Sequence, residues 1–177
     1  MAPKARKNGA TRDALVDALA SPACYPRGVE RVRVVETHIS IVFLTGTYAY
    51  KIKKPLKLPF LDFSTLARRR HFCQEEVRLN RRLAPSLYLG VVPIGGSRKA
   101  PRIGRKHAIE YAVKMREFPA DALLDAKLAK GGVTVEALTE FATRLAAFHG
   151  GLKPVARDYT DADAREAVDD DDAEHAE

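Results

Sequence analysis

Residues 48 to 53 alternate between two kinds of side chain, and this pattern predicts a β-strand. One face would carry Tyr48, Tyr50 and Ile52, and the other would carry Ala49, Lys51 and Lys53. A lysine that packs against the protein needs a negative partner, because burying an ammonium group alone is very costly. The strand therefore predicts a carboxylate, a phosphate, or both beside its lysine face.

The helix predicted after this strand supplies a candidate partner. We expect the helix to run from about Thr65 to Leu83, with Ser64 as its N-cap. Spacings of four, three and four residues place one stripe on it, namely Phe72, Glu76, Leu79 and Leu83. Glu76 is the charged member of this apolar stripe, so it needs a cation, and Lys51 is a suitable one.

Two alternatives to the Lys51–Glu76 pair stay open. Lys53 lies on the same strand face as Lys51 and could form the pair in its place. Glu75 would be the stripe member if the helix phase were shifted by one residue. The outer face of the helix is densely basic, with Arg68, Arg69, Arg70, His71, Arg78, Arg81 and Arg82.

The remaining elements predict an α+β fold. Residues 29–44 are rich in valine and isoleucine, and we favour two strands joined near Thr37–Ser40 over one long strand. Strands at 87–94 and 107–115, separated by a polar loop at 95–106, complete a five-stranded antiparallel sheet with one packed helix. A short helix capped by Thr11 and running through Ala20 would precede the sheet, and helices at 122–129 and 134–149 would follow it.

These elements suggest four parts of the chain. A basic arm with a short helix covers 1–28, the sheet domain covers 29–118, a helical segment covers 119–152, and an acidic tail covers 153–177. In the helical segment, an apolar stripe would face a core through Leu138, Phe141, Ala142, Leu145 and Phe148. The tail has no apolar cluster, so we expect it to be disordered.

The net charge of +7 conceals two regions of opposite sign. Residues 158–177 contain ten acids and one arginine, a charge of −9, which leaves +16 on residues 1–157. Such a basic body is a possible electrostatic footprint for nucleic acid. However, no recognised nucleic-acid motif is present, and 7% aromatic residues are too few to suggest a base-stacking platform.

A family resemblance rests on four runs of residues. They are Glu36-Thr37-His38-Ile39-Ser40, Tyr48-Ala49-Tyr50-Lys51-Ile52-Lys53-Lys54-Pro55, Phe60-Leu61-Asp62-Phe63-Ser64-Thr65-Leu66 and Tyr111-Ala112-Val113-Lys114-Met115-Arg116. This pattern covers about half the chain and resembles a bacterial aminoglycoside-phosphotransferase-like family, some of whose members carry a second, P-loop kinase domain. The resemblance implies a protein-kinase-like N-lobe followed by the beginning of a C-lobe.

The resemblance also implies how ATP would bind. A strand lysine paired with a helix glutamate, here Lys51 or Lys53 with Glu76, holds the α- and β-phosphates in kinase-like enzymes. In place of the kinase glycine-rich loop, this chain offers the hydroxyls and N–H groups of a turn containing Thr37, His38 and Ser40. At the hinge between the lobes, the adenine ring would meet the backbone of Met115, Arg116, Glu117 and Phe118.

The groups that catalyse phosphoryl transfer in such enzymes have no counterpart in this sequence. After His149 there is no His-x-Asp loop with a general base, no later magnesium-binding aspartate and no P-loop. We therefore expect no catalytic residue and no resident metal, with Mg²⁺ arriving only with ATP. Transfer from ATP to a small-molecule hydroxyl would be the ancestral reaction, which this chain alone should not perform.

Other functions and partners follow from the same observations. The chain could instead be a non-catalytic, pseudokinase-like module that binds nucleotide or protein, or a basic nucleic-acid-binding protein. A lone lobe would expose apolar surface, so we expect a missing C-lobe, a partner protein or self-association. No apolar run approaches a membrane span of about 18 residues. Two widely spaced cysteines, Cys24 and Cys73, indicate free thiols and a cytoplasmic location.

Overall fold

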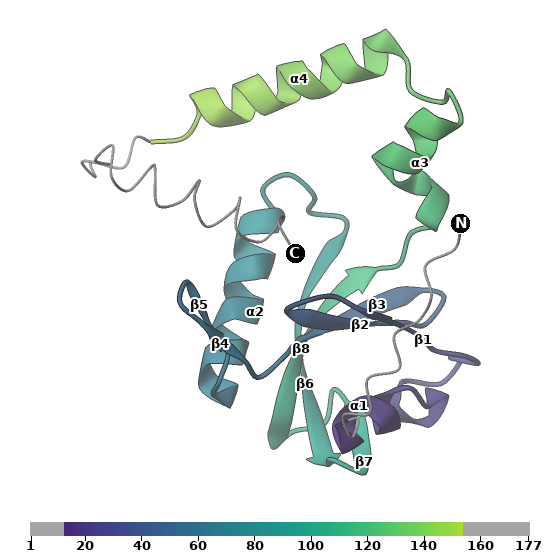
Figure 1. Cartoon of the computed structure of the whole chain (residues 1–177), viewed down its shortest axis with the longest axis vertical. Helices are drawn as coiled ribbons and strands as arrows, with labels where there is room; N and C mark the ends of the chain where they lie inside the picture. The colour runs from purple at the N-terminus through teal and green to yellow at the C-terminus, as the bar shows by residue number, and fades with distance from the viewer. Residues whose placement is uncertain (1–12, 154–177) are drawn as a thin grey trace. The chain divides into compact units, whose positions relative to one another are not determined.

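The predicted lysine strand forms in the computed structural model, which describes residues 13–153. It is β3, Tyr48–Lys53, and it lies within a six-stranded antiparallel sheet of order β1-β2-β3-β8-β6-β7 (Figure 1). The other strands are β1 Arg33–Glu36, β2 Ser40–Leu44, β6 Tyr88–Ser97, β7 Ala100–Ile103 and β8 Ala108–Arg116. Four α-helices accompany the sheet within these residues, which confirms the predicted α+β class.

Residues 33–44 form two strands, as the sequence favoured. β1 and β2 pair antiparallel, with Val35 opposite Val42. Thr37 closes the turn between them, because its N–H donates to the Ser40 carbonyl at 2.9 Å and its hydroxyl donates to the same oxygen at 3.1 Å. The same hydroxyl accepts from the Ser40 N–H at 3.0 Å. A single threonine side chain therefore fixes the geometry of this turn.

The prediction of five strands with a loop at 95–106 is wrong. β6 continues to Ser97, and β7 returns beside it as an additional edge strand. The basic residues Arg98 and Lys99, which suggested a loop, lie at the tip of this hairpin, while Pro101 of β7 is fully buried. Residues 56–63 contain a small hairpin of β4 Lys57–Leu58 and β5 Leu61–Asp62.

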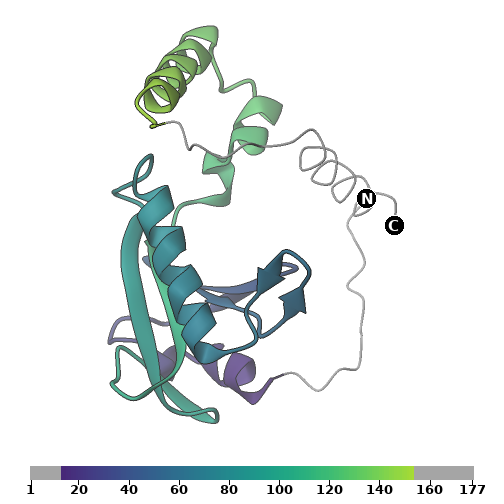
Figure 2. The same ribbon diagram turned by 90° about the vertical axis from the view of Figure 1, so that its left-hand side faces the viewer.

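The sheet separates two hydrophobic cores. On one face, helix α1 (Ala14–Leu19) and the 3₁₀ helix η1 (Pro22–Cys24) cover a core that includes Leu15, Leu19, Tyr50 and Ile52. On the other face, helix α2 (Leu66–Asn80) covers a smaller core of Cys73, Val77 and Val113. Figure 1 shows the two helices on opposite sides of β6 and β8, and in Figure 2 α2 faces the viewer. β3 consequently directs its lysines toward the face that α2 covers.

The caps of both helices differ from the predicted residues. Asp13 caps α1, and its carboxylate accepts a first-turn N–H at 2.9 Å, while the predicted cap Thr11 lies outside the described residues. Thr65 rather than Ser64 caps α2, accepting a first-turn N–H at 3.2 Å. The Ser64 hydroxyl is occupied elsewhere, because it donates to the Asp62 carboxylate at 2.6 Å.

The packed face of α2 is rotated from the predicted stripe. Its buried residues are Arg69, Cys73 and Val77. Leu79 and Leu83, predicted to be buried, are 39% and 52% exposed. The helix ends at Asn80, before it can bring the second of these leucines back to the sheet. Glu76, predicted to lie inside the apolar stripe, lies beside the packed face instead, and it still contacts the lysines of β3.

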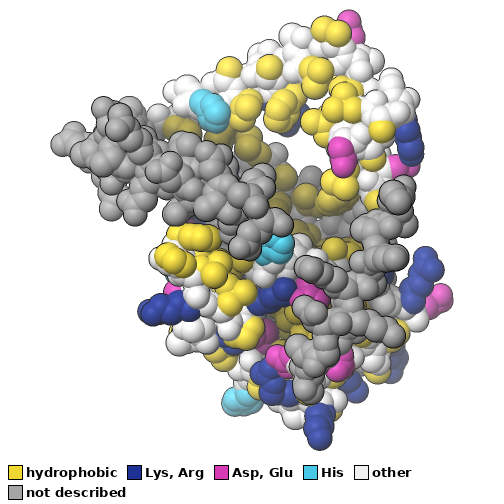
Figure 3. All heavy atoms as spheres, in the orientation of Figure 1, with side chains coloured by type: hydrophobic (Ala, Val, Ile, Leu, Met, Phe, Trp, Pro, Cys, Tyr) yellow, Lys and Arg dark blue, Asp and Glu magenta, His cyan; other side chains and the backbone are white. Residues whose placement is uncertain are grey.

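The described residues divide after Ala120 into two units, and the second is helical. The short 3₁₀ helix η2 Ala120–Ala122 spans the boundary, and α3 Leu124–Ala129 and α4 Val135–Gly150 lie in the second unit. Thr134 caps α4 at the predicted start of the last helix. The predicted stripe of α4 does not face a core, since no residue of this helix is buried and Phe141 is 62% exposed. Figure 3 shows apolar side chains along α3 and α4.

No helix formed by residues 13–153 is long and apolar enough to cross a membrane. The predicted basic arm before Thr11 lies outside the described residues. The predicted acidic tail also lies outside them, apart from Lys153.

Candidate functional site

Glu76 of α2 binds both lysines of β3. Its Oε1 lies 3.1 Å from Lys51 Nζ, and its Oε2 lies 2.8 Å from Lys53 Nζ. Both lysine alternatives are therefore realised around one carboxylate. Glu75 is not a member of the site, because it pairs with Arg78 at 2.6 Å on the exposed side of the helix.

The two lysines have different surroundings. The Lys51 side chain is 28% exposed, whereas the Lys53 side chain is 7% exposed and the Glu76 side chain is 12% exposed. The Lys53 ammonium also lies 4.9 Å from the centre of the Phe63 ring, a cation–π distance that suits a desolvated cation. Lys51 is thus the lysine that can meet a ligand, and Lys53 is an internal support for Glu76.

The site carries more positive than negative charge. Burial alone would raise the pKa of Glu76, but hydrogen bonds and charge from Lys53, and then from Lys51, outweigh burial and lower it. The carboxylate is therefore ionised at neutral pH and can neutralise one ammonium of the two. One positive charge remains, which favours an anionic ligand next to Lys51.

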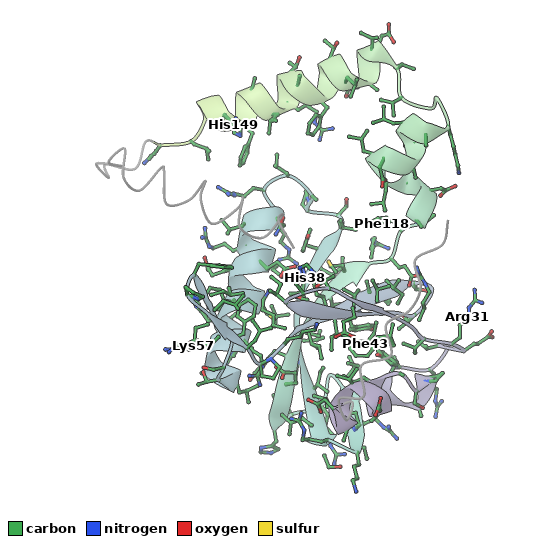
Figure 4. All side chains as sticks on the ribbon, in the orientation of Figure 1. Arg31, His38, Phe43, Lys57, Phe118 and His149 are labelled. Atoms are coloured by element: carbon green, nitrogen blue, oxygen red, sulfur yellow. The ribbon has the colours of Figure 1, made fainter. Side chains whose placement is uncertain are left out.

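The predicted phosphate turn is only partly directed at this site. The Thr37 hydroxyl is occupied in closing the turn, and His38 is exposed at the tip (Figure 4). Ser40 lies directly opposite Lys53 in the β2–β3 register, so its side chain shares the lysine face. Its hydroxyl oxygen is buried and has no hydrogen-bond partner among the residues that the structure describes.

The predicted hinge residues lie at the other end of β3. Met115 and Arg116 remain in the sheet, opposite Ala49 and Tyr48. The Glu117 N–H donates to the Thr47 carbonyl at 3.0 Å, and its carboxylate accepts from the Gly46 N–H at 2.7 Å. These contacts leave fewer free backbone groups for an adenine ring than the sequence suggested.

Phe118 follows this anchored stretch and is 48% exposed (Figure 4). The predicted binding residues therefore form two groups, one near Lys53 and one near Tyr48, separated by the length of β3. A strand of six residues spans about 17 Å between these groups. Lys51 lies between the two groups.

The sequence analysis missed a second ion pair, between Arg69 of α2 and Glu110 of β8. Arg69 is not on the outer basic face as predicted, because it is 7% exposed and its Nε lies 2.9 Å from both Glu110 carboxylate oxygens. Two signals could have indicated the pair. Arg69 precedes Glu76 by seven residues, which is two helical turns, and Glu110 interrupts an apolar strand.

Metal and thiol chemistry receive no support from the described residues. No cluster of three or more histidine, cysteine, aspartate or glutamate side chains among residues 13–153 could hold a metal ion. Cys24 and Cys73 are free thiols, as expected, and both are buried. Burial raises the pKa of the Cys73 thiol to about 11, so the reactive thiolate is scarce at neutral pH.

Comparison with known proteins identifies relatives without a described activity. The chain is 39% identical over 123 residues to uncharacterized proteins of Mycobacterium tuberculosis and Mycobacterium bovis. The match covers 67% of this chain and 22% of each mycobacterial protein, so the chain spans about a fifth of these curated relatives. No protein-family model and no solved structure matches the chain.

Proposed function

We propose that this chain is the ATP-binding lobe of an aminoglycoside-phosphotransferase-like kinase, with the fold of a protein-kinase-like N-lobe. The observation that carries the proposal is the ion pair between Lys51 of β3 and Glu76 of α2. In kinase-like enzymes a lysine held in this way binds the α- and β-phosphates of ATP. The antiparallel sheet with α2 packed on its lysine face is consistent with that architecture.

The proposed ligand would lie along β3. Its phosphates would contact Lys51, where the site has an uncompensated positive charge, and the Ser40 end of the strand would border them. The adenine ring would approach the hinge at the Tyr48 end, where Phe118 offers exposed apolar surface. Mg²⁺ would enter with the nucleotide, because it is commonly bound through substrate phosphates.

The proposed whole reaction is phosphoryl transfer from ATP to a small-molecule hydroxyl. This chain would contribute the nucleotide-binding lobe and would be inactive alone. The general base and the metal-binding aspartates would come from a C-lobe or partner protein that covers the apolar face of α4. We also propose a cytoplasmic location, since ATP is available there and both cysteines are free thiols.

Calorimetric titration with Mg-ATP tests the proposal on the purified chain. We expect binding at millimolar nucleotide or below, weakened about tenfold or more by Lys51→Ala, equivalent to about 1.4 kcal/mol. Lys57→Ala is the matched control, because Lys57 is an exposed lysine of β4 outside the site (Figure 4). An absence of binding by the unmodified chain, or equal losses in the two variants, would refute the proposal.

The basic body favours nucleic-acid binding as the second candidate function. The charge of +16 on residues 1–157 would attract a polyanion without requiring the Lys51–Glu76 geometry. Polynucleotide binding with a steep salt dependence, unchanged by Lys51→Ala, would support this function. Nucleotide binding without any transferase partner would instead support a pseudokinase-like module.

A further inference from the structure

The Arg69–Glu110 pair connects three segments around the start of α2. Besides its contacts with Glu110, Arg69 donates from Nη1 to the Phe63 carbonyl at 3.0 Å and to the Ser64 carbonyl at 3.2 Å. Glu110 Oε1 also accepts the Tyr111 N–H at 3.0 Å. The guanidinium therefore ties the loop before α2, the first turns of α2 and strand β8 into one network.

Stability alone does not explain why this ion pair is buried. Arg69 and Glu110 are 7% and 4% exposed, and such pairs carry a large desolvation cost. Replacement of a buried ion pair by apolar side chains of similar volume is often neutral or stabilising. The directional contacts of the guanidinium, by contrast, define an orientation that apolar packing does not.

Geometry links this network to the lysine site in two ways. Arg69 and Glu76 lie two turns apart on the same side of α2, so the helix is held to β8 at one point and to β3 at another. The second link runs through Phe63, whose carbonyl binds Arg69 and whose ring lies 4.9 Å from the Lys53 ammonium. Lys53 in turn holds Glu76 at 2.8 Å.

We infer that Arg69 and Glu110 are positioning residues, which set the rotation of α2 so that Glu76 stands between Lys51 and Lys53. Neither residue would touch the ligand. The inference rests on the proposed function only where it predicts a change in nucleotide affinity. The predicted effect of the Arg69–Glu110 pair on the surroundings of Glu76 does not depend on any ligand.

The test compares two double variants of the full chain. Arg69→Met with Glu110→Met replaces the buried pair by apolar side chains, and Arg78→Met with Glu75→Met is the control on the exposed face of the same helix. Three quantities are measured for each: cooperative unfolding in urea, Mg-ATP affinity, and the pH titration of the Glu76 carboxyl carbon by NMR. Glu76→Gln identifies the NMR signal. Among the described residues, the charged or titratable groups facing Glu76 are Lys51, Lys53, Tyr88 and Cys73.

We expect the Arg69→Met/Glu110→Met variant to unfold cooperatively but to bind Mg-ATP about tenfold or more weakly. Its Glu76 carboxyl should titrate at a higher pH than in the unmodified chain, because the lysines no longer hold it as closely. The Arg78→Met/Glu75→Met control should change neither the Mg-ATP affinity nor the Glu76 titration. An unchanged Glu76 titration in a folded double variant would overturn the inference.

The test still gives a decision if the unmodified chain does not bind Mg-ATP or if the double variant does not fold. If the unmodified chain does not bind Mg-ATP, the proposed function fails, while the Glu76 titration still decides the positioning role. If the double variant does not fold, Arg69→Lys provides the decision, because it keeps the charge but cannot reproduce the Nε contacts with Glu110 together with the Nη1 contacts with the two loop carbonyls. If the Glu76 carboxyl titrates at a higher pH in Arg69→Lys than in the unmodified chain, the inference is supported. An unchanged titration refutes it.

Discussion

Replacement of Glu76 by glutamine should destabilise the sheet domain far more than the same change at the neighbouring Glu75. Glu76→Gln preserves the volume of the side chain but removes the negative charge that two lysines share. The loss of this charge costs more at Lys53 than at Lys51, because the Lys53 side chain is 7% exposed and its ammonium cannot turn to solvent without disturbing Phe63. Lys51 is 28% exposed and can recover water more readily.

The magnitude follows from these exposures. Removing one partner from a buried ion pair costs about 3–5 kcal/mol, and a half-exposed pair contributes about 1 kcal/mol or less. The glutamine oxygen can still accept one hydrogen bond, so we expect a loss of about 3 kcal/mol in the free energy of unfolding. With a urea m-value of about 2 kcal/mol/M, the midpoint would fall by about 1.5 M.

Urea unfolding followed by far-ultraviolet circular dichroism measures this difference. Glu75→Gln should leave the midpoint nearly unchanged, because the Glu75–Arg78 pair lies at the surface. Adding Lys53→Met to Glu76→Gln should recover part of the loss, since the unpaired ammonium is then absent. Equal midpoints for the two single variants, or no recovery in the double variant, would show that Glu76 does not neutralise a buried lysine.

Four further outcomes can be measured. Because the pKa of Glu76 is lowered in the folded chain, the stability that its charge contributes is complete above the ordinary pKa of 4.5 and is lost as the pH falls through the folded-state pKa. Acid unfolding of Glu76→Gln should lack this pH-dependent loss of stability. Cys73 should resist iodoacetamide at pH 8 until the chain unfolds, because its pKa is about 11. Thr65→Ala should cost about 1 kcal/mol in thermal unfolding, and Ser64→Ala should cost less. Gly95→Ala should cost about 2 kcal/mol or more, because the added carbon would lie 2.4 Å from a backbone carbonyl oxygen.

The lysine strand and its glutamate were predictable because both depend on local periodicity. Alternation along β3 placed Lys51 and Lys53 on one face, and helical spacing placed Glu76 on the side of α2 that was expected to face the sheet. The number of lysines that one carboxylate binds was not predictable, since it depends on the depth and angle at which α2 packs. The structure joins both candidate lysines to Glu76 and excludes Glu75, which pairs with Arg78.

The errors arose where distant residues determine the outcome. Arg69 is buried because Glu110, 41 residues later, provides its counter-charge, and a basic run gives no indication of this. The choice between Ser64 and Thr65 as cap depends on the backbone and on Asp62, which occupies the serine hydroxyl. β7 was missed because its polar hairpin tip resembles an ordinary loop.

The placement of β3 between two cores has a consequence for sequence change among relatives. Tyr50 and Ile52 share one environment with the residues of α1, whereas Lys51 and Lys53 share another with Glu76. Substitutions on the two faces should therefore be compensated in separate sets of positions, one governed by side-chain volume and one by charge. An alignment of many homologues should show two covarying groups that meet on alternate residues of this one strand.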